Sequence, residues 1–199
     1  MCARYYIPQT EVSDDLDLLL MEAENRGILR DTKQGLKRGE ICPGDWAAVM
    51  AKSRKNEQAL AFPMRWGFRT ANSLIFNTRS ETADDKPLFR DSFQFRRCLI
   101  PLTAYFEWDH HQKPYIKYRF VPSDQVSFSF LAGIYRFEGN VPVFSVLTKA
   151  PTLELSAFHD RMPVIFSQAE KATWLYGSTR DALDVIGQAA STFHYGVDC

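Results

Sequence analysis

Four residues of this 199-residue chain have side chains or backbone groups suited to chemistry: Cys2, Asn77, Glu107 and His159. Cys2 is the most distinctive, because removal of Met1 leaves a cysteine with both a free thiol and a free α-amine. Such an amine condenses with an aldehyde to a Schiff base, and the neighbouring thiolate then closes a five-membered thiazolidine ring. A cysteine at position 2 is also compatible with no chemical role, so the other three residues must decide between these interpretations.

Glu107 and His159 both suit proton transfer. Glu107 lies between Phe106 and Trp108, where burial would raise its pKa toward the range useful for an acid or base. The alternative is a surface carboxylate that ends a strand. His159 has an ordinary pKa near ~6.5, which suits a proton shuttle, but a lone histidine also commonly caps a helix or binds a core carbonyl.

Asn77 donates and accepts hydrogen bonds without titrating, which suits the orientation of an amine or a substrate hydroxyl. Arg79 would lie on the same side of the chain if this segment is extended, and a guanidinium binds phosphate through two hydrogen bonds. An ordinary turn asparagine and a surface ion pair between Arg79 and Glu81 are the alternatives. Spacing alone leaves both interpretations open.

Composition limits the class of protein. The 24 Lys and Arg residues equal the 24 Asp and Glu residues, so any binding of nucleic acid must depend on local charge. The length predicts a single domain over residues 1–199. We expect a cytoplasmic monomer without a membrane segment, because the chain has no long apolar run, no signal-peptide pattern and no heptad repeat. The four scattered cysteines predict reduced thiols, and we expect no metal and no cofactor.

Hydrophobic patterning predicts an α+β fold: a bent, mainly antiparallel, barrel-like β-sheet with peripheral helices. The predicted strands cover residues 46–50, 59–62, 74–76, 98–108, 115–120, 126–135 and 141–147. The predicted helices cover residues 14–26, with Ser13 as N-cap and Gly27 as stop, 82–93, 151–158 and 167–177, and a last helix begins at Ser178.

Seven motifs occur in a fixed order along nearly the whole chain. They are Met-Cys-x-Arg at residues 1–4, Arg-Trp-Gly-Phe at 65–68, Asn-Thr-Arg-Ser-Glu-Thr at 77–82, the segment 86–101, Tyr-Phe-Glu-Trp at 105–108, Ala-Gly-Ile-Tyr at 132–135 and His-Asp-Arg-Met-Pro at 159–163. In these motifs the chain resembles the SRAP family, the SOS response-associated peptidases that are also called abasic site processing proteins. Several independent motifs in order are far more specific than one short pattern.

The resemblance implies an SRAP-like single domain that recognises abasic sites in single-stranded DNA and forms a covalent DNA–protein crosslink. Cys2 would react with the ring-opened sugar aldehyde, Asn77 would orient the amine or the sugar, Glu107 would serve as acid and base, and His159 would move protons at the sugar oxygen. The DNA contacts that we expect with this interpretation are Arg4, Pro43, Trp66, Arg79, Trp108 and Arg161.

Three positions differ from the usual family pattern: Ala3, Thr78 and Ala104. Of these, Thr78 would add a hydroxyl beside the site. Two other functions stay open at this point. One is a peptidase that uses Cys2, His159 and Asn77, with Met1 removal as its own reaction. The other is a non-catalytic module that binds single-stranded DNA or a partner, in which Cys2 has no role.

Overall fold

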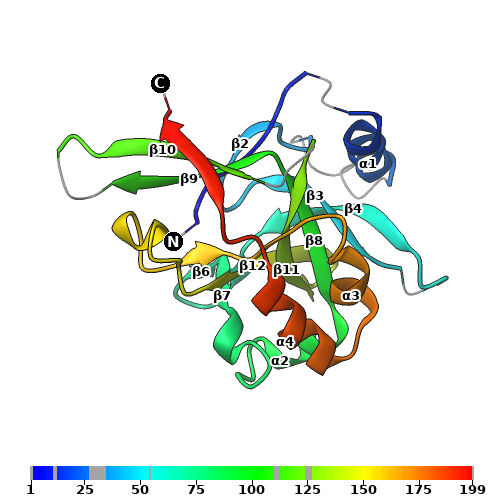
Figure 1. Cartoon of the computed structure of the whole chain (residues 1–199). Helices are drawn as coiled ribbons and strands as arrows, with labels where there is room; N and C mark the ends of the chain where they lie inside the picture. Colours follow the sequence, from blue (N-terminus) through cyan, green and yellow to red (C-terminus); the bar gives the residue numbers. More distant parts are fainter. Residues whose placement is uncertain are drawn as a thin grey trace.

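The computed structural model describes residues 2–10, 13–26, 35–53, 55–109, 113–123 and 127–198. Five of its strands form a closed barrel (Figure 1), because each pairs with two others in the order β12-β4-β3-β8-β11-β12. They are β3 (Trp46–Lys52), β4 (Ala59–Trp66), β8 (Arg97–Leu102), β11 (Ser129–Glu138) and β12 (Val141–Lys149). All of these pairs are antiparallel except β12 with β4. The predicted fold class is therefore confirmed.

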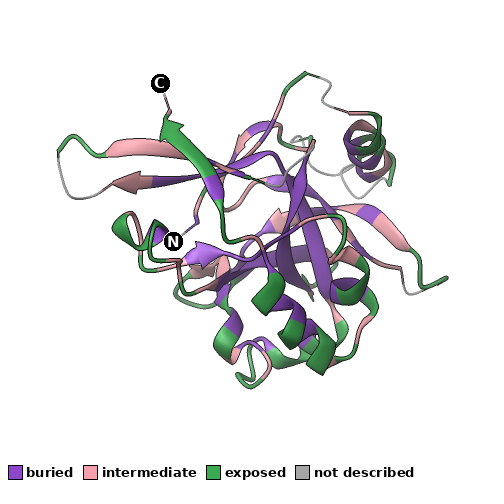
Figure 2. Cartoon of the chain, viewed as in Figure 1, coloured by how far each residue is buried: buried purple, intermediate pink, exposed green. Residues whose placement is uncertain are grey.

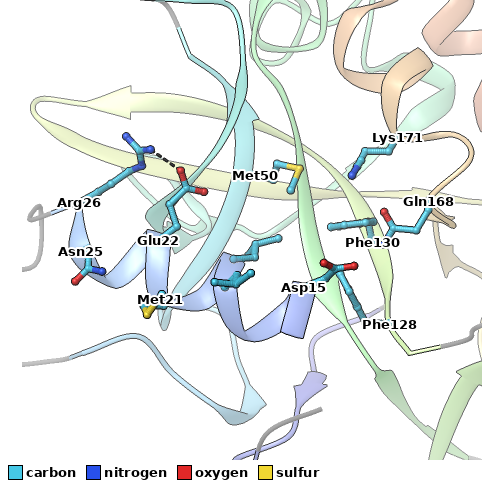
Figure 3. Close-up of a pocket in the computed structure, with 12 residues that line it drawn as sticks. Asp15, Met21, Glu22, Asn25, Arg26, Met50, Phe128, Phe130, Gln168 and Lys171 are labelled. Carbon is cyan, nitrogen blue, oxygen red and sulfur yellow. Dashed lines mark hydrogen bonds and ion pairs between the residues drawn. The ribbon is translucent and has the colours of Figure 1, made fainter. Parts of the chain in front are cut away.

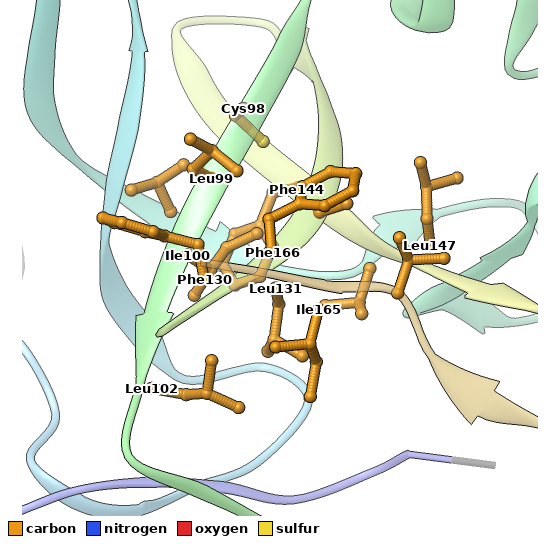
Figure 4. Close-up of a cluster of buried hydrophobic side chains, with 14 of the residues drawn as sticks. Cys98, Leu99, Ile100, Leu102, Phe130, Leu131, Phe144, Leu147, Ile165 and Phe166 are labelled. Carbon is orange, nitrogen blue, oxygen red and sulfur yellow. The ribbon is translucent and has the colours of Figure 1, made fainter. Parts of the chain in front are cut away.

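Three of the barrel strands, β8, β11 and β12, are mostly apolar and buried, which places them at the centre of the molecule. Every residue of β8 is buried, and Figure 2 shows the same for most of β11 and β12. Side chains from β8, β11 and β12 meet in one cluster that includes Ile100, Phe130, Leu131 and Phe144 (Figure 4). Burial of such side chains contributes about 1.5–3 kcal/mol each.

A second sheet lies beside the barrel in the strand order β15-β10-β9-β1-β2. Its strands are β1 (Tyr5–Ile7), β2 (Gly39–Ile41), β9 (Ala104–Asp109), β10 (Ile116–Pro122) and β15 (Phe193–Val197). Aromatic rings hold three of its strands together, since the Tyr105 ring centroid lies 5.0 Å from that of Phe120 and 5.5 Å from that of Phe193. This sheet carries the N-terminal segment.

Helices cover the outside of the barrel, where α1 (Asp14–Asn25) packs on β3 and β4 and α3 (Lys171–Tyr176) packs on β3 and β8. In α1, the side chain of Ser13 accepts a hydrogen bond from the Leu16 N–H, and the apolar stripe of the helix is buried. The other helices are α2 (Arg90–Phe95) and α4 (Thr179–Gln188), with the short 3₁₀ helices η2 (Ser80–Thr82) and η3 (Leu155–Ala157). The remaining strands are β5 (Phe68–Arg69), β6 (Leu74–Ile75), β7 (Asn77–Arg79), β13 (Met162–Pro163) and β14 (Ile165–Phe166). No helix in the described part of the chain has the length and apolar character to cross a membrane.

Several predicted elements differ from the structure. The strand predicted at 98–108 is two strands, because Thr103 leaves the barrel there and donates its backbone N–H to the Tyr6 carbonyl at 2.9 Å. The helix predicted at 82–93 is instead η2, a series of turns and the short α2, because Pro87 lacks an N–H donor and restricts the residue before it.

Three further differences concern helix limits and short strands. The segment predicted as a helix at 151–158 contains only η3. Ser167 binds Glu170, but the helix begins at Lys171. The strands at 5–7, 39–41 and 193–197 were not predicted, because they are short. Gly27 and residue 126, which belong to predicted elements, lie outside the described residues.

Gly133→Ala is expected to destabilise the barrel. A Cβ at this position would lie 2.5 Å from Ile100 Cδ1 and 3.0 Å from Cys98 Sγ, and overpacking of this kind costs about 1–3 kcal/mol. Gly187→Ala in α4 is the control: its Cβ would meet nothing within 4 Å, so alanine should stabilise the helix by about 0.5–1 kcal/mol. Urea unfolding measures both effects, and a Gly133→Ala protein as stable as the wild type would contradict this account of packing.

Candidate active site

The N-terminal segment lies between the second sheet and the barrel, and hydrogen bonds to both hold it in place. On one side, the Phe106 N–H of β9 donates to the Arg4 carbonyl at 3.0 Å, and Tyr5 pairs with Tyr105. On the other side, Nδ2 of Asn77 donates to the Cys2 carbonyl at 2.8 Å. The two predicted residues Cys2 and Asn77 are therefore brought together from positions 75 residues apart in the chain.

The thiol of Cys2 is fully buried, and its Sγ lies 3.8 Å from the Arg4 carbonyl. Burial raises the pKa of this thiol far above its ordinary value, and the negative charge of Glu107 raises it further. The thiol is therefore held in its protonated form beside a carboxylate. It becomes a nucleophile only when a base removes its proton.

Glu107 is the nearby group that can act as this base. It lies on β9 and its residue is only 6% exposed. Burial raises its pKa to about 7, and the charge of Asp160 also acts to raise it. A carboxyl group with this pKa exchanges its proton near neutral pH, as general acid–base chemistry requires. The predicted burial of Glu107 is thus confirmed, and its role in proton transfer stays a prediction.

Asn77 is positioned by the barrel. It begins β7, which pairs in parallel with β12 so that Asn77 lies opposite Val146. Its Nδ2 donates a hydrogen bond to the Cys2 carbonyl, whereas its Oδ1 is buried and has no hydrogen-bond partner in the described part of the chain. Asn77 therefore fixes the Cys2 backbone with one end of its amide and offers a free acceptor at the other.

The segment that carries His159 is held near Glu107 by the neighbouring residue Phe158. The ring of Phe158 packs against Tyr118 at 4.8 Å and Phe120 at 5.2 Å between centroids. Tyr118 lies opposite Glu107 in the pairing of β10 with β9. This contact places the segment after η3 beside Glu107, which agrees with the effect of Asp160 on the Glu107 pKa. In Figure 1 the blue N-terminal strand accordingly runs toward the yellow segment that contains η3.

The Nδ1 atom of His159 has two possible partners. It lies 3.1 Å from the backbone N of Arg161, from which it can accept a hydrogen bond, and 2.5 Å from Oδ1 of Asp160, to which it can donate one when protonated. The Arg161 contact leaves the proton on Nε2, whereas the Asp160 contact favours the form protonated at Nδ1. Asp160 was not predicted as a site residue, although its place next to His159 was the available signal.

Arg161 ties the His159 segment to the strand that carries Asn77. Its guanidinium binds both oxygens of Glu81, at 2.8 and 2.7 Å, and donates to the Thr148 carbonyl at 2.7 Å. A paired guanidinium and carboxylate of this geometry restrict each other's orientation. The pair Arg161–Glu81 therefore fixes His159 relative to β7, which is a structural role in addition to the DNA contact predicted for Arg161.

Arg4 and Trp108 lie on the other face of the second sheet from Glu107, because side chains alternate along β9. The guanidinium of Arg4 lies 5.3 Å from the Trp108 ring centroid and binds Glu40 at 2.9 Å. Lys117 also binds Glu40, and its ammonium lies 4.0 Å from the Phe106 ring. Phe106 is buried, so the accessible part of this face is the exposed Arg4 beside the half-buried Trp108 ring. A cation next to an aromatic ring suits single-stranded nucleic acid.

Trp66 corrects one prediction. Its indole is fully buried, its Nε1 donates to the Phe76 carbonyl at 2.8 Å, and its ring stacks on Phe144 at 6.0 Å. The ring has no exposed surface on which a base could stack, so Trp66 belongs to the core beside the site. The Thr78 hydroxyl is also directed away from the site, because it is buried and lies 2.8 Å from the Ser145 hydroxyl. Arg79 is exposed and Pro43 is half-buried in a turn.

A separate groove of ≈ 700 Å³ lies between α1 and the strands β3 and β11 (Figure 3). Met21 and Met50 line it together with charged residues, and the ion pair between Glu22 and Arg26 spans 2.5 Å at its edge. None of the ten predicted site residues lines this groove. The described residues also contain no group of three His, Cys, Asp or Glu side chains placed to hold a metal ion.

Comparison with known protein families identifies the family to which the chain belongs. The family model described as SOS response associated peptidase (SRAP) matches residues 1–195, and the chain belongs to this family. Solved structures agree with this fold. The match to a protein from Bacteroides thetaiotaomicron covers 100% of this chain and 92% of the chain of that protein, with a TM-score of 0.74 and 19% sequence identity. The match to a phage-related protein from Bordetella bronchiseptica covers 99% of this chain and 94% of the chain of that protein, with a TM-score of 0.73 and 16% sequence identity.

Curated relatives carry the name abasic site processing protein. YobE of Bacillus subtilis is 34% identical over 113 residues, which are 54% of this chain and 51% of the relative. YedK of Escherichia coli is 27% identical over 183 residues, which are 88% of this chain and 79% of the relative. The chain thus spans about half the length of the Bacillus relatives that it matches, and a larger share of YedK.

The burial of Glu107 is expected to make stability depend on pH. Its pKa is about 7 in the folded protein, against an ordinary value of 4.5, so the unfolded chain releases this proton at lower pH than the folded one. The contribution of Glu107 to the free energy of unfolding is therefore greatest below pH 4.5 and falls as the pH rises to 7. Glu107→Gln removes this titration.

Urea unfolding at pH 5 and pH 8 measures the effect. The unfolding free energy of Glu107→Gln relative to wild type should increase by about 2–3 kcal/mol between these two pH values. A difference between the two proteins that does not change with pH would show that Glu107 has an ordinary pKa.

Proposed function

We propose that this protein recognises abasic sites in single-stranded DNA and captures them in a covalent crosslink on Cys2 after Met1 has been removed. One observation carries the proposal. The backbone of Cys2 is fixed by Asn77 at 2.8 Å, while its buried thiol lies in the field of Glu107, whose pKa is about 7. Membership of the SRAP family and the names of the curated relatives support the same function.

The proposed reaction joins one aldehyde to one cysteine with loss of one water. The neutral α-amine of Cys2 attacks the aldehyde carbon of the ring-opened sugar and gives a carbinolamine, which loses its hydroxyl as water to form an imine. The thiolate then adds to the imine carbon, and the nitrogen takes up a proton. The product is a thiazolidine ring.

We assign the acid and the base of these reaction steps to the titratable residues that lie near Cys2. Glu107 as carboxylate removes the proton of the Cys2 thiol, and as carboxylic acid it protonates the departing hydroxyl. His159 exchanges a proton with the sugar oxygen as the ring opens, and Asp160 stabilises its protonated form. Asn77 holds the Cys2 carbonyl and offers its free Oδ1 to the amine or the sugar.

The thiazolidine ring protects the DNA strand. An imine withdraws electrons and promotes β-elimination, which breaks the strand, whereas ring closure removes the imine. Lyase activity would result when the thiol fails to trap the imine. The proposed DNA contacts that remain from the sequence are Arg4, Pro43, Arg79, Trp108 and Arg161, and we propose that a cytoplasmic monomer makes them.

Self-processing is the second candidate activity, because the Cys2 thiol lies beside a base. Attack of this thiol on the carbonyl of Met1 would transfer the methionyl group to sulfur and free the α-amine, and water would then release methionine. Peptidase action on other proteins and a purely non-covalent binding module are the alternatives that the following experiment separates.

Cys2→Ser is expected to abolish the heat-stable adduct with DNA. The experiment incubates Met1-free protein with a single-stranded oligonucleotide that carries one abasic site, followed by denaturing electrophoresis and intact mass. The wild-type adduct should have the summed mass of protein and DNA minus one water. Cys42→Ser is the matched control, because Cys42 is also a free thiol, and it should leave the adduct unchanged.

Four outcomes would contradict the proposal. The first is no adduct with Met1-free wild-type protein, and the second is the same heat-stable adduct with Cys2→Ser. Strand binding that is unaffected by Cys2→Ala and never becomes covalent would identify a binding module. Hydrolysis of unrelated peptides that is lost in Cys2→Ala would instead identify a peptidase.

The rate of adduct formation should rise with pH through an inflection near 7, because Glu107 must be ionised to accept the thiol proton. Glu107→Gln should lose this inflection and react about 10²-fold more slowly or worse. Single-turnover rates between pH 5.5 and 8.5 test this, and ionisation of the α-amine, with its ordinary pKa of about 7.7–8.0, should persist in both proteins. Identical pH profiles would rule out Glu107 as the base.

A further inference from the structure

A pocket of ≈ 300 Å³ opens at one end of the barrel, and we call it the barrel-end pocket. Its walls come from four of the five barrel strands, β3, β4, β11 and β12, and its rim from the turn after β3. None of the ten predicted site residues lines this pocket. The proposed function therefore does not use it.

The wall side chains of the barrel-end pocket belong to the inner face of the barrel. Met50 of β3 faces the groove beside α1 (Figure 3), so the next residue, Ala51, faces inward. One residue of β8 pairs with both Ala51 and Gly133, and residues paired in this way share a face of the sheet. Tyr135 and Phe137 follow Gly133 in β11 at intervals of two and therefore face inward as well.

Two prolines account for the opening at this end of the barrel. The ladder between β12 and β4 contains two residue pairs, and the residues just before these pairs include Pro142 in β12 and Pro63 in β4. Proline has no backbone N–H with which to extend a ladder. The two strands therefore separate, and Phe62, Met64 and Phe137 line the space between them.

The rim of the barrel-end pocket carries positive charge. Lys52 and Lys55 line the pocket at its rim together with Ser53. Lys52 pairs with Glu57 at 2.8 Å, but the Glu57 side chain is 78% exposed, so water weakens this ion pair. Lys55 is exposed, and its ammonium has no ion pair within the described residues. An anionic group at the rim would thus meet two lysines opposed by one exposed carboxylate.

The apolar walls and the cationic rim together favour one chemical class of ligand. Cavities of roughly 300–1,000 Å³ with apolar walls and few polar groups are typical of small-molecule sites, and barrel mouths are among their usual places. Phe137 is 50% exposed, and an apolar body in the pocket would remove this ring from water. Single-stranded DNA fits less well, because bases stack on exposed rings, whereas Tyr135 is buried and Phe62 is half-buried.

We propose that the barrel-end pocket binds a small alkyl carboxylate. The alkyl chain lies against Phe62, Met64 and Phe137, and the carboxylate lies at the rim between Lys52 and Lys55. This inference goes beyond the proposed function and does not depend on it, because the pocket shares no residue with the candidate active site.

Displacement of the dye 8-anilinonaphthalene-1-sulfonate measures binding to the pocket. The dye has an apolar body and one negative charge, and its fluorescence rises in apolar surroundings. Decanoate should displace it from the wild-type protein. Decylammonium has the same chain with the opposite charge, and the lysines of the rim should prevent it from doing so.

Two variants test the walls and the rim separately. Phe137→Glu should weaken decanoate binding about tenfold or more, because it adds a like charge at the pocket. Its control is Phe95→Glu, since Phe95 of α2 is 69% exposed and does not line this pocket. Lys55→Gln should weaken binding about 2–5-fold, and the exposed Lys86 provides the control Lys86→Gln. Urea unfolding shows that each variant is folded.

Five results would overturn the inference. They are displacement of the dye by decylammonium as well as by decanoate, wild-type binding of decanoate by folded Phe137→Glu or Lys55→Gln, and equal weakening by a control variant. Loss of dye binding in Met21→Glu but not in Phe137→Glu would place the dye in the groove beside α1. Displacement by oligo-dT but not by decanoate would identify a nucleic-acid site instead.

Discussion

The hydrogen bond from Asn77 to the Cys2 carbonyl joins two parts of the molecule that fold as separate sheets. Cys2 precedes β1 of the second sheet, whereas Asn77 begins β7, which pairs with the barrel strand β12. Because Asn77 bonds to the main chain, this contact does not occupy the thiol or the α-nitrogen of Cys2. Asn77 thus fixes the position of Cys2 and leaves both groups available, as the proposed reaction at an N-terminal cysteine requires.

The site is maintained at the expense of stability. Burial of Glu107 disfavours its charged form. A buried carboxyl group of this kind would not be selected for folding alone. Apolar packing in the closed barrel offsets this cost. The segment that carries His159 has only a 3₁₀ turn of its own, and the two hydrogen bonds from Arg161 to Glu81 hold it in place.

Much of the fold could be predicted from the sequence, because alternating and apolar strand patterns indicated the barrel. Ordered motifs pointed to Cys2, Asn77, Glu107 and His159, and the structure brings Cys2 and Asn77 into contact. The chemical roles of these four residues stay predictions. Other features depend on tertiary pairing that no local pattern encodes. Trp66 was expected to contact DNA, but its neighbours Tyr5 and Phe144 come from distant strands and enclose it. The short strand β1 exists only because β2 and β9 pair with it, and Asp160 matters only because folding places it near Glu107.

Strand β12 has a role that its apolar sequence does not suggest. It pairs with Arg65 at Val143 and with Asn77 at Val146, and the Thr148 carbonyl binds Arg161. One continuous strand therefore sets the spacing between Arg65, Asn77 and the segment that carries His159, at ~3.3 Å per residue. β12 thus fixes the distances between these three groups. A one-residue insertion within it would change the distance from one group to the next and turn the side chains that follow to the opposite face, even though no side chain of β12 is a candidate site residue.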